Sequence, residues 1–336
     1  MKSLIQKLTQ TTGPSGFEDQ VRDLIKAELA SHVDELRVDN LGNLIARKGT
    51  RRDGGLDIMV AAHMDELGIM VTHIDENGFA RFTTLGTVYP RNTAGGRVRF
   101  LNGARGVIGM EPNTNRSLVT SIDKMYIDLG VRAKKDCPVA VGDVAAFERT
   151  FTDLGDRIVS KALDNRVGVA ALIETIKSIK STPHCVFAVF TVQEEVGTRG
   201  AGAAAFGINP NIGFSLDVTS TGDTPNAKLN QVSLGGGPAI KIKDTAMIAD
   251  PRIVAWMQSG AKSAKIPTQP EILVGGWTDA RVIQLTRAGI PAGSLSIPAR
   301  YIHSPSEMVD INDVNHTVKL LTHLLSHPAA PLEKSL

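Results

Sequence analysis

Two histidines and several carboxylates of this chain follow short apolar runs, at places where buried β-strands would end. The first is His63 in the segment AAHMDE, with Asp65 two residues further on. In an extended segment, residues two apart point to the same side. A histidine that binds a metal through one ring nitrogen needs an acceptor for the other, and a nearby carboxylate supplies it. The pair therefore favours a metal-binding histidine, although a histidine in a surface loop would give the same pattern.

The remaining candidates lie further along the chain. Asp164 in KALDNRVG precedes a helical pattern, where it could either cap the first turn or bridge two cations. Glu194 and Glu195 follow the run CVFAVFTV, and two adjacent glutamates at the end of a buried strand are costly unless a cation lies between them. Asp217 ends the run FSLD, and His303 follows PAGSLSIP.

Together these side chains have the composition of a divalent metal site. Histidine and carboxylate ligands suit zinc, cobalt or manganese. Five ligands with one shared carboxylate make two open sites with ions roughly 3.5–4 Å apart, as in two-metal hydrolases. One glutamate is then free to transfer a proton. Because ligands of an open α/β sheet bind at the carboxyl ends of its strands, these strand ends are where such residues would meet.

The elements that position these residues alternate between strands and helices. Apolar runs without polar alternation indicate strands buried on both faces, and they occupy 58–62, 185–192 and 212–218. Helical spacing recurs in the segments 1–35, 164–179, 250–265, 278–289 and from about 310 onward. This alternation predicts an α/β sandwich around a mostly parallel sheet.

The pattern of apolar and turn residues changes between residues 67 and 155. Hairpin patterns such as GIMVTHI, DENG and FARFTTL replace helical periodicity in this stretch. We therefore predict a small β-rich domain at 67–155, inserted into a larger domain formed by 1–66 and 156–336.

The composition excludes several classes of protein. The 336 residues include 37 basic and 35 acidic ones, so the net charge of +2 provides no strong field for nucleic acid or an anionic membrane. The aromatic content of 4% argues against a base-stacking surface. No apolar stretch approaches the ~20 residues that span a bilayer. Two cysteines without a spacing motif indicate a reducing compartment, and we predict a cytoplasmic protein.

Other catalytic sites fit the residues less well. No Gly-x-Ser-x-Gly segment is present for a serine hydrolase, and GTRGAG lacks the Gly-Lys-Ser/Thr ending of a phosphate loop. A glycosidase needs two carboxylates ~5–9.5 Å apart across a bond, which adjacent glutamates do not naturally provide. A closed structural metal site would be rich in cysteine. A hydrolase of another amide or of a glycan, acting through the same two-metal site, remains an alternative.

Six segments, in this order and spacing, resemble the M42 family of metallo-aminopeptidases, which includes the tetrahedral aminopeptidases. They are AAHMDELG, SKALDNRVG, TVQEEVGTRGA, LDVT, GGWTDA and RYIHSPSEMV, and the likeness covers essentially the whole chain. It implies a catalytic α/β domain with a PDZ-like β domain inserted after the first histidine motif. It further implies dimer contacts through the insert, and self-compartmentalised dodecamers built from dimers.

The resemblance also implies a role for each site residue. The expected metal ligands are two histidines and three carboxylates, namely His63, Asp164, Glu195, Asp217 and His303. His63 and Asp217 would hold one ion, Glu195 and His303 the other, and Asp164 would bridge them. Glu194 would be the general base and Asp65 would orient His63. The implied activity is removal of N-terminal residues from short peptides by a water that two zinc or cobalt ions, or manganese, activate.

The preferred N-terminal residue of the substrate does not follow from the resemblance. Trp277 in GGWTDA departs from the family's Gly-Gly-Thr-Asp segment near the substrate pocket. Lys241 and Lys243 follow the turn GGGP, and a lysine that lines the pocket would favour acidic side chains. As solvated strand lysines they would have no such effect.

Overall fold

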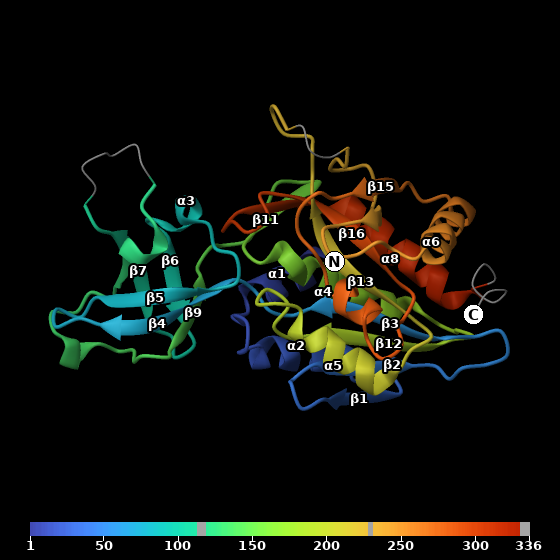
Figure 1. The fold of residues 1–336 in the computed structure, drawn as a ribbon, viewed down its shortest axis with the longest axis horizontal. Coiled ribbons are helices and arrows are strands. Elements are labelled where there is room, and N and C mark those ends of the chain that lie inside the picture. The colour runs from blue at the N-terminus through green and yellow to red at the C-terminus, as the bar shows by residue number, and fades with distance from the viewer. Residues whose placement is uncertain (113–118, 228–230, 330–336) are drawn as a thin grey trace.

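The computed structural model describes residues 1–112, 119–227 and 231–329, which form an α/β sandwich with a small β barrel beside it (Figure 1). The barrel comes from one continuous stretch of the chain. The sandwich is built from the segments before and after that stretch. The predicted combination of an α/β fold with a β-rich insert is therefore confirmed.

In the described residues, eleven strands form the large sheet of the sandwich. Nine of them follow the spatial order β1-β2-β12-β3-β13-β16-β17-β11-β10, and β14 and β15 are attached beside β16. The strands are β1 (Glu35–Val38), β2 (Leu44–Lys48), β3 (Asp57–His63), β10 (Thr152–Asp153), β11 (Arg157–Ser160), β12 (Cys185–Thr191), β13 (Ile212–Ser220), β14 (Ala239–Lys243), β15 (Gln269–Ile272), β16 (Ala292–Arg300) and β17 (Glu307–Asp310).

The centre of this sheet is parallel. β12, β3, β13 and β16 are neighbours that all run in the same direction, so their carboxyl ends lie at one edge. The outer pairs β1–β2, β2–β12, β16–β17, β17–β11 and β11–β10 are antiparallel. The strand β14 pairs with β16 in antiparallel fashion and with β15 in parallel.

Helices cover both faces of the sheet. One face packs against α1 (Lys2–Gln10), α2 (Asp19–Leu29), α4 (Leu163–Ser178), α6 (Pro251–Ala264) and α8 (Ile311–Ser326). The other face packs against the short helices α5 (Arg199–Ile208) and α7 (Ala280–Gln284). Within the described residues, every helix is too short or too polar to cross a membrane.

The strand β3 shows why its sequence lacks polar alternation. Ile58 and Val60 belong to the core under the larger helix layer, whereas Met59 and Ala61 belong to the core under α5 and α7. Successive side chains of a strand point to opposite faces, so both sets must be apolar when both faces are covered. The strand buried on both faces that the sequence predicts is confirmed here.

The barrel closes in the order β4-β5-β8-β7-β6-β9, and its paired strands are antiparallel. Its strands are β4 (Gly68–Ile74), β5 (Ala80–Leu85), β6 (Arg97–Phe100), β7 (Arg105–Met110), β8 (Met125–Asp128) and β9 (Val144–Phe147). Three short helices connect them: α3 (Pro90–Thr93), η1 (Ile122–Lys124) and η2 (Lys134–Asp136). The barrel has its own hydrophobic core, which includes Val71, Phe82 and Phe100.

The helix α4 differs from its prediction. Its sequence suggests one apolar stripe, but the helix is buried on nearly all sides because it lies between the sheet and the helices α1, α2 and α8. Even Arg166 has no exposed surface. Its guanidinium donates hydrogen bonds to the carbonyls of Leu8 (2.6 Å), Thr11 (3.0 Å) and Gly13 (3.2 Å). A buried cation thus ties the end of α1 and the loop after it to α4.

We predict that Arg166→Ala strongly lowers the free energy of unfolding. The change leaves three backbone carbonyls without their donor and removes a partner that lies 3.5 Å from the buried Glu66. Loss of one member of a buried ionic network costs about 3–5 kcal/mol. Urea denaturation followed by circular dichroism measures the change. Arg37→Ala is the matched control, because Arg37 is exposed and its loss should cost at most about 0.5 kcal/mol. Equal effects of the two substitutions would contradict this role.

Candidate metal centre

The candidate residues come together at the carboxyl edge of the parallel strands. His63 is the last residue of β3, and Asp217 lies near the end of the neighbouring β13. Glu194 and Glu195 follow β12, and His303 follows β16. These strands lie side by side with the same direction, so their ends converge although the residues are far apart in sequence.

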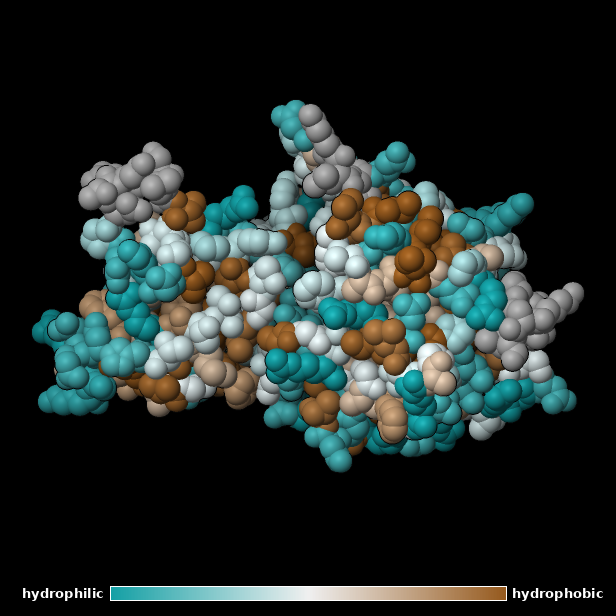
Figure 2. All heavy atoms as spheres, in the orientation of Figure 1, coloured by the Kyte–Doolittle hydropathy of each residue, from teal (hydrophilic) through white to brown (hydrophobic). Residues whose placement is uncertain are grey.

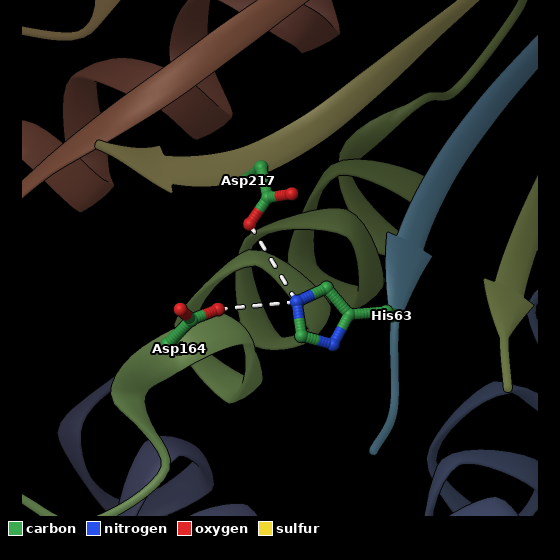
Figure 3. A group of neighbouring side chains, drawn as sticks. All are labelled: His63, Asp164 and Asp217. Atoms are coloured by element: carbon green, nitrogen blue, oxygen red, sulfur yellow. Dashed lines mark hydrogen bonds and ion pairs between the residues drawn. The ribbon is translucent and has the colours of Figure 1, made fainter. Parts of the chain in front are cut away.

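The first group consists of His63, Asp164 and Asp217 (Figure 3). The Nε2 atom of His63 lies 3.1 Å from Oδ1 of Asp164 and 3.7 Å from Oδ1 of Asp217. All three residues are buried. One ring nitrogen and two carboxylate oxygens thus face a common point, which is an arrangement that could hold a divalent ion.

The second group shares Asp164 with the first. The Nε2 atom of His303 lies 3.4 Å from Oδ2 of Asp164 and 3.4 Å from Oε2 of Glu195. Asp164 therefore directs one oxygen to each histidine. A carboxylate placed in this way can serve two neighbouring ions at once.

The structure decides between the two interpretations of Asp164. Although Asp164 lies at the start of α4, its backbone is not helical there, with φ −73° and ψ 109°. The residue at the N-cap position is Ala162, and α4 has no side-chain capping hydrogen bond. The Asp164 carboxylate therefore points to the two histidines instead of capping the helix.

Burial makes the carboxylates of this site hard to ionise in isolation. Desolvation, followed by the charges of neighbouring carboxylates, raises the pKa of Glu195 to about 8 and that of Asp217 to about 7. The same causes raise the pKa of Glu194 well above its ordinary value. Oε1 of Glu194 and Oε1 of Glu195 are buried and have no hydrogen-bond partner among the described residues. Such atoms call for a cation.

For the two histidines and Asp164, the pKa shifts favour the charged form of the side chain. Desolvation lowers the pKa of His63, but hydrogen bonds with Asp164 and Asp65 outweigh it and bring the pKa well above the ordinary value. For His303 the same balance, with Asp164 and Glu195 as the main partners, gives a pKa of about 9. The two histidines in turn hold the pKa of Asp164 below its usual range, against the effect of desolvation. A metal ion that binds these histidines would have to displace a proton from a ring nitrogen of each.

Asp65 fixes the geometry of both motifs. Its Oδ1 lies 3.3 Å from Nδ1 of His63 and accepts a hydrogen bond of 3.0 Å from the backbone N–H of Glu194. Its Oδ2 accepts from the N–H of Glu195 (3.1 Å) and from the hydroxyl of Ser15 (2.6 Å). One fully buried carboxylate thus orients the histidine at the end of β3 and holds the turn that carries both glutamates.

Three residues of the site escaped the sequence analysis. Glu307 accepts hydrogen bonds from the backbone N–H groups of Asp164 (2.8 Å) and His303 (2.9 Å), so it ties two ligand-bearing loops together. Asp279 accepts from Thr191 and lies close enough to raise the pKa of Glu194. Ser15 lies in a segment that reads only as a helix break. Glu307 and Asp279 lie within the motifs RYIHSPSEMV and GGWTDA, so their position in those motifs was the available signal.

A cavity of about 570 Å³ opens beside both groups of ligands. Its volume is in the range of small-molecule sites. The metal-site residues form one part of its wall, and the segment 273–278, with Trp277, forms another. Of the two lysines considered above, Lys241 lines the cavity, whereas Lys243 is exposed and its ammonium bonds to the carbonyl of Asp244.

The chain belongs to the M42 glutamyl aminopeptidase family, whose sequence profile matches residues 42–320. It is therefore a member of a family of peptide hydrolases. It is 46% identical to a putative aminopeptidase of Acetivibrio thermocellus over 97% of this chain and 98% of that protein.

Solved structures show the same similarity. The aminopeptidase APDkam598 of Desulfurococcus kamchatkensis has a TM-score of 0.95 and 38% identity, over 99% of this chain and 96% of that one. The TET1 peptidase of Pyrococcus horikoshii has a TM-score of 0.87 and 32% identity, over 96% and 98% of the two chains. The resemblance found in the sequence motifs is thus confirmed.

We predict that Asp164→Asn costs more metal than Asp217→Asn. An asparagine at 164 offers one neutral oxygen where two charged ones served two groups, so metal content should fall toward zero. Asp217 belongs to one group only, so its loss should leave about one ion per chain. Elemental mass spectrometry after gel filtration measures both. Asp153→Asn, which changes an exposed carboxylate, is the control. Full metal content in Asp164→Asn would refute the shared role.

Proposed function

We propose that this protein is an aminopeptidase that removes N-terminal residues from short peptides with the help of two divalent metal ions. The observation that carries the proposal is the pair of ligand groups that share Asp164, with Glu194 beside them and a cavity next to both. Membership of an aminopeptidase family supports the reaction class.

In this proposal the ligands divide as the resemblance implies. His63 and Asp217 would hold one ion, Glu195 and His303 would hold the other, and Asp164 would serve both. The donor set of two imidazoles and three carboxylates suits zinc, cobalt or manganese. When bound, the ions supply the lowered pKa of a water molecule and the polarisation of the scissile carbonyl.

The chain's own residues perform the proton transfers. Glu194 is buried at 6% exposure, lines the cavity and has an Oε1 atom without a partner among the described residues. It takes a proton from the attacking water and returns it to the leaving amine. Asp65 keeps the His63 ring and the Glu194 backbone in place during both steps.

We predict that the two adjacent glutamates have separable roles. Glu194→Gln keeps the shape of the side chain but cannot accept a proton, so turnover should fall ~10²–10⁴-fold while the metal content stays at about two per chain. Glu195→Gln offers only a neutral oxygen to its ion, so metal content should fall toward one. Metal stoichiometry and the turnover number on aminoacyl-nitroanilides are measured for both variants.

Two results would contradict this assignment. If Glu194→Gln loses metal and Glu195→Gln retains it, the roles are reversed. If neither variant changes rate or metal content, the pair has no part in catalysis. A soluble cellulose substrate, assayed beside the nitroanilides, distinguishes the proposed peptidase from a glycan hydrolase acting through the same site.

We also propose the assembly that the resemblance implies. In it the insert, residues 67–155, is a PDZ-like dimerisation domain, and dimers build a dodecamer. The Pyrococcus horikoshii TET1 peptidase assembles into a tetrahedron or a large octahedral shell, which supports a homo-oligomer here. Exposed apolar side chains on β7, Val107 and Met110, offer a contact surface on the barrel. A cytoplasmic setting remains part of the proposal, since Cys137 and Cys185 are both free thiols.

We predict that Val107→Asp reduces the particle size. A charge placed on an apolar contact surface opposes association, because it must lose its hydration there. Light scattering coupled to size-exclusion chromatography measures the mass. Leu41→Asp is the control, since Leu41 is equally exposed and apolar but lies between β1 and β2 of the sandwich. A wild-type chain that is monomeric at micromolar concentration would contradict the proposed assembly.

A further inference from the structure

The wall of the cavity contains a lysine that is paired with a glutamate. Lys241 of β14 lines the cavity and is 1% exposed, and its Nζ donates a hydrogen bond of 2.7 Å to Oε1 of Glu271. Glu271 of β15 has no exposed surface. The two residues are direct partners in the parallel register of β14 and β15, so the backbone itself places them together.

The surroundings hold this pair in position. The hydroxyl of Thr219 on β13 donates a hydrogen bond of 2.5 Å to the same Glu271 oxygen. The other oxygen, Oε2, is buried and has no hydrogen-bond partner among the described residues. The buried carboxylate is therefore held beside the Lys241 ammonium, which is the cation that pairs with it among the described residues.

The rest of the cavity wall contains no competing charge. Apart from the residues of the metal centre, Lys241 is the one charged side chain among the described residues that line the cavity. Leu273, Val274, Trp277 and Ile302 contribute apolar surface. Val274 and Trp277 are also strongly exposed, and the space-filling view shows hydrophobic surface over the part of the sandwich that carries β15 (Figure 2).

The pair changes what a lysine in this position can recognise. An unpaired buried ammonium would attract an acidic substrate side chain. Here Glu271 already neutralises it, so a substrate carboxylate would enter a desolvated space next to a fixed negative charge. A lysine or arginine side chain would meet the Lys241 ammonium instead. Like charges brought together in such a space are strongly unfavourable, so both classes of charged side chain are disfavoured.

We propose that the Lys241–Glu271 pair makes this cavity select peptides whose N-terminal side chain is uncharged and largely apolar, such as leucine or methionine. The inference rests on the proposed aminopeptidase activity, in which the first side chain of the substrate occupies the cavity beside the metal centre. The neutral pair then acts as a specificity device, and the four apolar residues provide the contact surface.

The first experiment measures kcat/KM of the metal-loaded wild-type protein on nitroanilides of Leu, Met, Glu and Lys. Leu and Met substrates should exceed both Glu and Lys substrates by about tenfold or more. A preference for Glu, or for Lys, overturns the inference and leaves the proposed function intact. Absence of turnover on all four substrates contradicts the proposed function itself.

The second experiment separates the two charges. Glu271→Gln removes the counter-charge, so the Glu/Leu ratio of kcat/KM should rise about tenfold or more. Lys241→Met leaves Glu271 unpaired, so the Lys/Leu ratio should rise instead. The double variant removes both charges and should restore the wild-type ratios. These ratios report recognition, because a general structural defect lowers the rates on all substrates together.

Lys177→Met is the matched control, since it breaks the ion pair of Lys177 with Glu28 and neither residue lines the cavity. It should leave the ratios between substrates unchanged. Uniform loss of activity in Glu271→Gln and Lys241→Met, with unchanged ratios, overturns the inference. If a single variant does not fold, as judged by its thermal melting, the wild-type panel and the double variant still decide the question.

Discussion

The crowding of buried negative charge at one edge of the sheet is the constraint on which the site depends. Carboxylates from three separate segments, with Glu194, Glu195 and Asp217 among them, meet where water is largely excluded. Their mutual repulsion and their desolvation both oppose ionisation. The two imidazoles bring the pKa of Asp164 below its usual range, but they do not offset the raised pKa values of the other three. The arrangement becomes favourable when divalent cations supply the missing positive charge. The repulsion that opposes ionisation of the carboxylates therefore favours metal binding.

Other buried groups hold the side chains of this site in position in the folded protein. Asp65 receives four hydrogen-bonding contacts, from His63, Ser15, Glu194 and Glu195, so the ligands cannot relax away from one another. Burial raises the pKa of Asp65, but the hydrogen bond with His63 and the charge of that ring, followed by hydrogen bonds from Ser15 and the N–H of Glu194, outweigh it and hold the pKa below its usual range. Glu307 joins the loop after β16 to the start of α4, because it accepts hydrogen bonds from the backbone N–H groups of His303 and Asp164. The rigidity of the centre therefore comes from residues that never need to touch a metal.

The sequence predicted what depends on local pattern and on strand ends. His63 and Asp217 could be found because a run buried on both faces must end where its polar residues begin. The pairing of Lys241 with Glu271 could not, because it depends on the register of two short strands thirty residues apart. The burial of Arg166 was equally hidden, since an arginine within a helical stripe is normally solvated. When the partner of a polar residue is set by the tertiary structure, the periodicity of the sequence does not predict the pair.

The barrel takes part in the site as well as standing beside it. Thr87 and Tyr89, in the segment that follows β5, line the cavity, and the Tyr89 ring lies 6.3 Å from the His303 ring. Asn92 in α3 donates a hydrogen bond to the carbonyl of His303. Gly86 lies against Glu195 so closely that a Cβ there would approach its side chain to 3.1 Å. An insert used only for assembly would not need these contacts. Because the barrel touches two ligand-bearing residues, any movement of the insert against the sandwich must also move one wall of the cavity.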